Sequence, residues 1–453
     1  MVKRHGVART GAAVSVAALV ESYRQGERSP VEVARETLAR IESMPPHVNA
    51  FVQVTGDLAL AQAAEAERAY AVGSAGPLTG VPITIKDLLD VAGLPTGGGS
   101  LAASGEPATA DAPFVAAVRS AGAVIVGKTA TPESGWKAET SSRVHGTTEN
   151  PWQAGCTSGG SSGGAAAAAA LLPDVLHHGG DGAGSIRIPS AMCGVAGLKP
   201  TWGLVPTDPV NSGLSVQGPI ARSVADVALL LDATAGTSSL AGLGNGVAGV
   251  AVSFSADLGF AAVDPAVRAC FEQAVAVFEG LGARLEECHP ALEDPWPIVD
   301  GIWCATQASQ VAGRFEGVRD LLDPGRVPVI ERGLGMRATD LVAVQSARAR
   351  YAAAWDAFMA RRDLVLTPTL PITAFAAGLD HPGTVAGRAV EYLSWTPFTY
   401  TFNVTGQPAA TVPCGMVDGL PVGLQIAGRR GADALVLRAA ATFEQARPWS
   451  FPA

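Results

Sequence analysis

Three short stretches of this sequence hold side chains that could act together as a nucleophile and its base. Ser161 and Ser162 lie between two pairs of glycines in GGSSGG, and Ser185 follows another glycine-rich run in DGAGSIRIP. Lys86 ends the apolar, β-branched run GVPITIK, which is typical of a strand. Because glycine tolerates positive φ and close backbone approach, dense glycine beside a serine indicates backbone amides aimed at an oxyanion.

Nucleophilic attack on a carbonyl is the chemistry that these residue types suit. A serine hydroxyl needs a base to take its proton, and a lysine can serve if burial lowers its pKa. The required change, from about 10.4 to about 7–8, corresponds to roughly 4 kcal/mol of disfavoured charge. Ile83 and Ile85 provide apolar neighbours for Lys86, whereas Asp87 would oppose the shift. We therefore expect the Asp87 carboxylate to face away from the amine.

Each stretch alone also fits a solvated surface loop, but the three together resemble a known family. GVPITIKDLLDVAGLPTGGGS, GGSSGG and DGAGSIRIP are similar to the lysine segment, first serine motif and nucleophile motif of the amidase signature family. The resemblance is strong over residues 75–235. It implies that Lys86 is the base, Ser161 the bridging serine and Ser185 the nucleophile.

The resemblance also implies supporting residues around this triad. In the family the peptide bond that corresponds to Gly160-Ser161 is cis, and the segment that corresponds to residues 134–151 lines the acyl side of the pocket. Two departures from the family pattern are Ala183 and Gly180, where many members carry Gly and Ser or Thr. The implied roles are oxyanion hole for Gly182, Ala183 and Gly184, support for Asp181, Arg187 and Ser162, and substrate binding for Gly135, Trp136 and Lys137. Trp303 is a further substrate-binding candidate, as an aromatic residue of the 290–395 region and not through the resemblance.

Composition limits the partners. The net charge of −9 argues against nucleic acid or an anionic membrane as the main partner, so we expect a small-molecule substrate and leave a homodimer open. The six cysteines lack metal-ligand or CxxC spacing and indicate reduced thiols in a cytoplasmic protein. The seven histidines show no metal-ligand spacing either, and the GxGxxG match at Gly244 precedes its strand. We expect neither metal nor cofactor.

Alternating helical and strand patterns predict an α/β fold with a mixed, largely parallel central sheet and helices on both faces. We expect one amidase signature domain over residues 1–453, with a signature core over 75–235, a helical insertion over 290–395 and closing strands over 398–428. Helices are predicted over 13–24, 30–43, 57–72, 112–120, 224–235, 264–281, 299–312 and 338–361, and strands over 78–90, 123–127, 250–254 and 283–287.

The expected function is cleavage of a C–N bond in a small, uncharged aryl or alkyl amide or carbamate, through an acyl-enzyme. One alternative is the amidase-like subunit of a glutamine-dependent tRNA amidotransferase, which would use the same triad and pass ammonia to a partner. Another is a serine α/β-hydrolase, because Gly159-x-Ser161-x-Gly163 satisfies the nucleophile-elbow pattern with His381 as a candidate base. That pattern leaves Lys86 and Ser185 unexplained.

Overall fold

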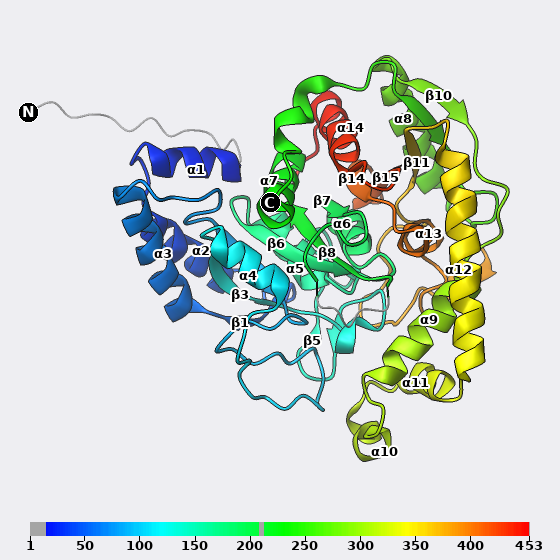
Figure 1. Cartoon of the computed structure of the whole chain (residues 1–453), viewed down its shortest axis with the longest axis horizontal. Helices are drawn as coiled ribbons and strands as arrows, with labels where there is room; N and C mark the ends of the chain where they lie inside the picture. Colours follow the sequence, from blue (N-terminus) through cyan, green and yellow to red (C-terminus); the bar gives the residue numbers. More distant parts are fainter. Residues whose placement is uncertain (1–14, 208–212, 453) are drawn as a thin grey trace, which may run out of the picture.

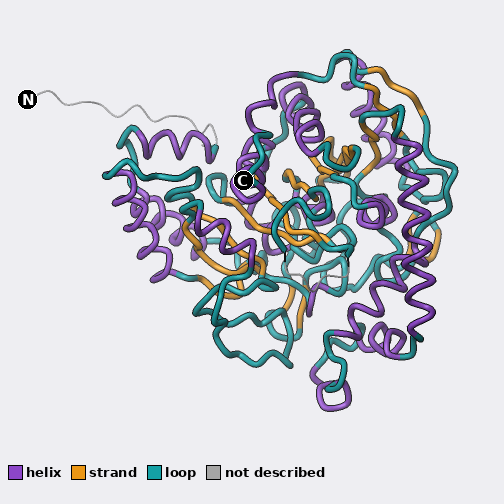
Figure 2. The backbone as a smooth tube through the Cα atoms, viewed as in Figure 1, coloured by secondary structure: helices purple, strands orange, loops and turns teal. Residues whose placement is uncertain are grey.

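The computed structural model describes residues 15–207 and 213–452, in which one large sheet runs through the molecule. In Figure 2 the strands pass through the middle and helices surround them. The strand order is β1 (Phe51–Val54), β3 (Val124–Thr129), β2 (Pro82–Lys86), β6 (Leu176–Asp181), β8 (Val216–Ala221), β7 (Ala196–Lys199), β14 (Ala409–Val417), β15 (Leu420–Gly428), β11 (Leu364–Pro368), β9 (Ala251–Phe254) and β10 (Arg284–Glu287).

The sheet is mixed, as expected. Parallel pairing joins β3, β2 and β6 near one edge and β11, β9 and β10 at the other. The strands between them, from β6 through β8, β7, β14 and β15 to β11, pair antiparallel, as does β1 with β3. Antiparallel pairing is therefore more extensive than the alternation of helix and strand patterns suggests.

Helices cover both faces of the sheet. They are α1 (Val16–Arg24), α2 (Pro30–Glu42), α3 (Gly56–Ala71), α4 (Pro113–Ser120), α5 (Gly163–Leu171), α6 (Arg187–Cys193), α7 (Val224–Ala235), α8 (Pro265–Gly280), α9 (Trp296–Ser309), α10 (Phe315–Val318), α11 (Val327–Leu334), α12 (Ala338–Met359), α13 (Pro397–Thr405) and α14 (Asp433–Ala446). Short 3-10 turns at Glu133–Gly135, Leu240–Asn245 and Arg319–Leu321 and two small hairpins, β4 (Ser141–Ser142) with β5 (Gly146–Thr147) and β12 (Thr384–Val385) with β13 (Arg388–Ala389), complete the described elements.

Strand periodicity divides the core between the two faces. Ile125 packs in the same buried cluster as residues of α7, α8 and α14, whereas its neighbours Val124 and Val126 pack with α2, α3 and α5. This is the alternation expected when successive side chains of a strand point to opposite faces. Helices α1 to α3 lie at one end of the molecule and α12 lies at the other (Figure 1).

Local signals set several helix ends where the sequence predicts them. Ser29 forms a capping box with Glu32 ahead of Pro30, and Gly236 ends α7 in the left-handed conformation. The helix predicted over 13–24 is described from Val16 onward, and positions 13 and 14 lie outside the described residues.

Two expectations for the C-terminal half need correction. Residues 398–405 belong to α13 and not to a closing strand, because Pro397 suits the first helical turn and Gly406 ends the helix with positive φ. The region 290–395 is also not purely helical, since β11 within it is a buried strand of the central sheet.

The sheet topology brings the two chemical segments together. β2 and β6 are parallel neighbours, so their carboxyl ends lie on the same side of the sheet. Lys86 ends β2 and Asp181 ends β6, and the two residues are therefore brought near each other. The chain leaves β6 through residues 182–186 into α6, while α5 begins directly after Ser162. The carboxyl ends of parallel strands are where α/β proteins most often place their sites.

Candidate active site

Lys86 and the two serines of GGSSGG form a compact buried cluster. Lys86 Nζ lies 2.6 Å from Ser161 Oγ and 2.9 Å from Ser162 Oγ, and the Ser162 hydroxyl also reaches the Gly180 carbonyl at 3.4 Å. Lys86 is only 1% exposed. The Gly160-Ser161 peptide bond is cis, as the family resemblance implies.

Burial gives Lys86 the protonation behaviour that a base needs. Loss of solvation lowers its pKa to about 7, against a smaller opposing effect of Asp181. The expectation that Asp87 faces away is confirmed, because its carboxylate pairs with Lys128 Nζ at 2.7 Å and accepts from the Gly98 amide. A substantial neutral fraction of Lys86 is therefore present at neutral pH.

Ser185 lies beside this cluster at the start of the turn into α6. Its carbonyl accepts a hydrogen bond of 3.2 Å from the Ser162 amide, which joins the two serine motifs through the backbone. The Ser185 side chain is slightly exposed, and its hydroxyl donates to no acceptor in the described part of the chain. The Lys86–Ser161 contact is thus formed, whereas contact between the Ser161 and Ser185 hydroxyls would have to form with substrate, as catalytic hydrogen bonds often tighten on binding.

A buried ion pair holds the loop that carries Ser185. Asp181 and Arg187 are paired at 2.9 Å, and both side chains are inaccessible to solvent. Burial would raise the pKa of Asp181, but Arg187 and other donors bring it down to about 2. Arg187 also donates to Gln425 and Asn403, both at 2.7 Å. Asp181 also accepts from the amides of Gly184 and Ile186, so the pair is tied to the backbone of the loop.

The backbone amides of the loop have different partners. The Gly184 amide donates to Asp181 Oδ1 at 2.9 Å, so it is committed to the loop and not free for an oxyanion. The amides of Gly182 and Ala183 have no acceptor among the described residues. The expected role of Gly184 as an oxyanion donor is therefore corrected, and Gly182 and Ala183 stay as candidates.

The expected substrate-binding residues fall into two groups. Gly135 lies against Ser161, since a Cβ at this position would be 2.9 Å from Ser161 Oγ. Trp303 lies over the oxyanion loop, because a Cβ at Gly182 would be 2.9 Å from its ring. The Trp303 indole donates to the Trp136 carbonyl at 3.1 Å, so these segments are fastened together.

Trp136 and Lys137 make their contacts within the protein. The Trp136 ring stacks on Tyr392 with a centroid distance of 6.0 Å. Lys137 Nζ lies 2.5 Å from Asp380 and 2.9 Å from the Ser141 hydroxyl, with Glu139 at 3.4 Å. The Lys137 ammonium is therefore paired with carboxylates of the protein.

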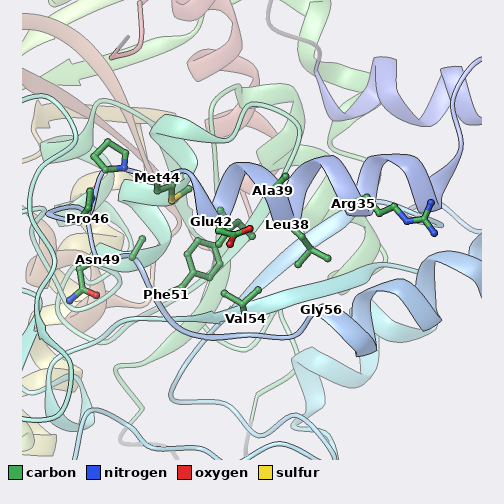
Figure 3. A pocket seen from close by; sticks show the side chains of 13 residues that line it. Arg35, Leu38, Ala39, Glu42, Met44, Pro46, Asn49, Phe51, Val54 and Gly56 are labelled. Carbon is green, nitrogen blue, oxygen red and sulfur yellow. The ribbon is translucent and has the colours of Figure 1, made fainter.

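A groove of about 650 Å³ lies away from this cluster, between α2 and β1 (Figure 3). Leu38, Met44, Phe51 and Val54 contribute apolar side chains to it, and none of Lys86, Ser161 and Ser185 lines it. The chemistry and the groove are thus separate features of the molecule.

The structure adds residues that the sequence did not single out. The Lys86 amide donates to His178 Nδ1 at 3.2 Å, which places the ring proton on Nε2, next to Gln217 Oε1 at 2.8 Å. Burial lowers the pKa of His178 to about 3, so this imidazole is neutral. Two residues of α13 also hydrogen-bond to the segment that leads to Ser185: Thr399 donates to the Ala183 carbonyl and Asn403 donates to the Asp181 carboxylate. No spacing pattern links these residues to the triad in sequence, so only the packed fold could find them.

The described residues contain no group of three or more metal-ligating side chains that could hold a metal ion. Within the same ranges, no helix combines the length and apolar character needed to cross a membrane.

Comparison with known proteins identifies the family. The chain belongs to the amidase family, whose model matches residues 32–437. It is 39% identical to an acylamidase of Rhodococcus erythropolis, with 96% of both chains covered. It is 33% identical to one of the subunits of the glutamyl-tRNA(Gln) amidotransferase of Geobacter metallireducens, with 95% of this chain and 96% of the relative covered.

A solved structure supports the same assignment. A bacterial aryl acylamidase of the amidase signature family matches with a TM-score of 0.89 at 30% identity, and 96% of each chain is covered. The expected family and fold class are therefore confirmed. The chain is therefore an amidase, an enzyme that acts on C–N bonds.

Proposed function

We propose that this amidase hydrolyses a small, uncharged amide or carbamate through Ser185 as nucleophile, Ser161 as bridging serine and Lys86 as base. The observation that carries the proposal is the 2.6 Å contact between Lys86 Nζ and Ser161 Oγ, made by a lysine whose pKa is lowered to about 7. A neutral amine in contact with a buried hydroxyl is the arrangement that serine activation by lysine requires.

The proposed reaction begins when neutral Lys86 accepts the Ser161 proton and Ser161 accepts the Ser185 proton. The Ser185 oxygen then bonds to the carbonyl carbon, and the negative charge on the carbonyl oxygen faces the amides of the glycine-rich loop. The proton returns through Ser161 to the leaving nitrogen as the C–N bond breaks. Water repeats these steps on the acyl-enzyme and releases the acid.

An uncharged substrate is favoured by the charges around the site. The positive charge of Lys137 is already paired with carboxylates, and the fully buried Asp181 and Arg187 pair with each other. Trp303 supplies an aromatic surface next to Gly182. These features support an aryl or alkyl group on the substrate, in agreement with the acylamidase names of two similar proteins.

A second candidate is the ammonia-producing component of a tRNA amidotransferase, because one relative covered over nearly its whole length is named as part of such an enzyme. The purified chain should be assayed with nitroanilides, primary amides, carbamates and glutamine, beside its Ser185→Ala variant. Turnover of an aryl amide or carbamate that is lost in the variant supports the proposal. Ammonia release from glutamine alone would favour the amidotransferase role.

A further inference from the structure

We propose that Thr399 is a positioning residue that fixes the peptide plane between Ala183 and Gly184 and thereby helps to orient the Ala183 amide, a candidate oxyanion donor. This inference rests on the proposed function. Thr399 Oγ1 lies 2.8 Å from the Ala183 carbonyl oxygen, and both residues are buried. Thr399 comes from α13, more than 200 positions along the chain from the loop that it contacts.

The hydroxyl proton of Thr399 has two acceptors within reach, the carbonyls of Ala183 at 2.8 Å and Thr396 at 3.0 Å. The Thr396 carbonyl already accepts from the amides of Thr399 and Tyr400. The Ala183 carbonyl has no other donor among the described residues. Since a buried carbonyl without a donor is costly, the proton belongs on the Ala183 side.

Both ends of this peptide unit are held. Its carbonyl accepts from Thr399, and its N–H, which belongs to Gly184, donates to Asp181 Oδ1 at 2.9 Å. A peptide unit is planar, so fixing both polar ends prevents it from turning. The Ala183 amide belongs to the preceding peptide unit, which joins this one at the Ala183 Cα. Holding one of the two planes restricts the rotations that would turn the Ala183 N–H away, and this contributes to the preorganisation that an oxyanion hole requires.

Gly184 makes this approach possible. Its φ is +125°, and a Cβ there would lie 2.3 Å from Thr399 Oγ1. The glycine that the sequence places before Ser185 is therefore needed for the Thr399 contact, in addition to its own conformation.

The test compares two threonines of α13. Thr399→Val keeps the side-chain volume and removes the hydroxyl, whereas Thr399→Ser keeps the hydroxyl. Thr401→Val is the matched control, because Thr401 is buried on the same helix and its hydroxyl donates to the Pro397 carbonyl at 2.8 Å, away from the Ser185 loop. If Thr399→Val does not fold, Thr399→Ala takes its place and carries the same expectation.

We expect Thr399→Val to lower kcat by about tenfold and to leave KM little changed, because about tenfold is the effect of losing one hydrogen bond. The Ki of 2,2,2-trifluoroacetophenone, whose serine adduct carries an oxyanion, should rise by a similar factor. Thr399→Ser and Thr401→Val should behave like the unaltered protein. A structural role alone would lower stability without this paired change in kcat and Ki.

Unchanged kcat and Ki in folded Thr399→Val would overturn the inference, as would an equal loss in Thr401→Val. Failure of the proposed function has a different signature, because Ser185→Ala would then retain turnover. The two results can therefore be told apart.

Discussion

Lys86 and Ser161 are in hydrogen-bond contact, with Nζ 2.6 Å from Oγ, although they come from the end of β2 and the turn before α5. Burial makes this contact chemically useful, since a lysine in water would stay charged. The parallel pairing of β2 with β6 then brings the Ser185 loop to the same edge.

The pKa of Lys86 predicts how activity depends on pH. Because the neutral amine is the base and its pKa is about 7, kcat/KM should rise with pH, reach half its maximum near pH 7 and level off above it. Lys86→Ala should remove this limb and lower kcat/KM by about 10²–10⁴. A pH series with one aryl amide measures both.

Lys199 provides the control for this assignment. Burial lowers its pKa to about 7 as well, but its Nζ donates to the Pro200 carbonyl at 3.0 Å. Lys199→Met should therefore keep the midpoint near pH 7. If the pH-profile midpoint near 7 is lost in Lys199→Met but kept in Lys86→Ala, then Lys86 is not the base.

The two serines in contact with Lys86 should differ in effect. Ser161→Ala removes the bridging hydroxyl and should slow acylation by about 10²–10⁴, the scale of a lost proton-transfer group. Ser162→Ala removes a supporting contact of 2.9 Å and should slow it by about tenfold. Single-turnover kinetics measure the acylation rate of each variant. Equal losses of rate in Ser161→Ala and Ser162→Ala would contradict distinct roles for the two serines.

Lys137 should matter for stability and not for binding an uncharged substrate. Lys137→Met leaves the buried Glu139 carboxylate without its cation and should lower the free energy of unfolding by about 3–5 kcal/mol. The KM of an uncharged amide should stay the same. Asp380→Asn is the milder control, with a loss of about 1 kcal/mol, because Asp380 is partly exposed. A tenfold rise in the KM of Lys137→Met, with an unchanged free energy of unfolding, would show instead that Lys137 contacts the substrate.

The Asp181–Arg187 pair should appear in acid unfolding. The folded pKa of Asp181 is about 2, below its ordinary value of 3.8, so its stabilisation is present above pH 4 and disappears as pH falls through 2. Asp181→Asn leaves Arg187 unpaired and should lower the free energy of unfolding by about 3–5 kcal/mol at pH 7. Urea unfolding from pH 7 to pH 3 should show this deficit narrowing below pH 4, and a constant deficit would argue against the ion pair.

The sequence predicted the local elements well because their signals are local. The helix over 224–235 is set by Ser223 and Gly236, and the Lys86 strand by its β-branched residues. The closing strands begin at Ala409 and not at 398, the bound that the resemblance gives, because Pro397 and Gly406 mark the ends of a helix.

The motif residues were predicted because each lies within a short, glycine-marked stretch. His178, Thr399 and Asn403 were missed because their roles depend on contacts between distant segments. Lys137 shows the same limit: the resemblance names it as a substrate-binding candidate, but only the fold reveals its ion pair with Asp380 from a remote loop.

Identification of the acylated residue tests the central claim most directly. The protein should be treated with a fluorophosphonate, digested and mapped by mass spectrometry, with Ser185→Ala treated in parallel. We predict a single adduct on Ser185 that is absent from the variant. An adduct on Ser161 would contradict the account and favour the nucleophile-elbow interpretation.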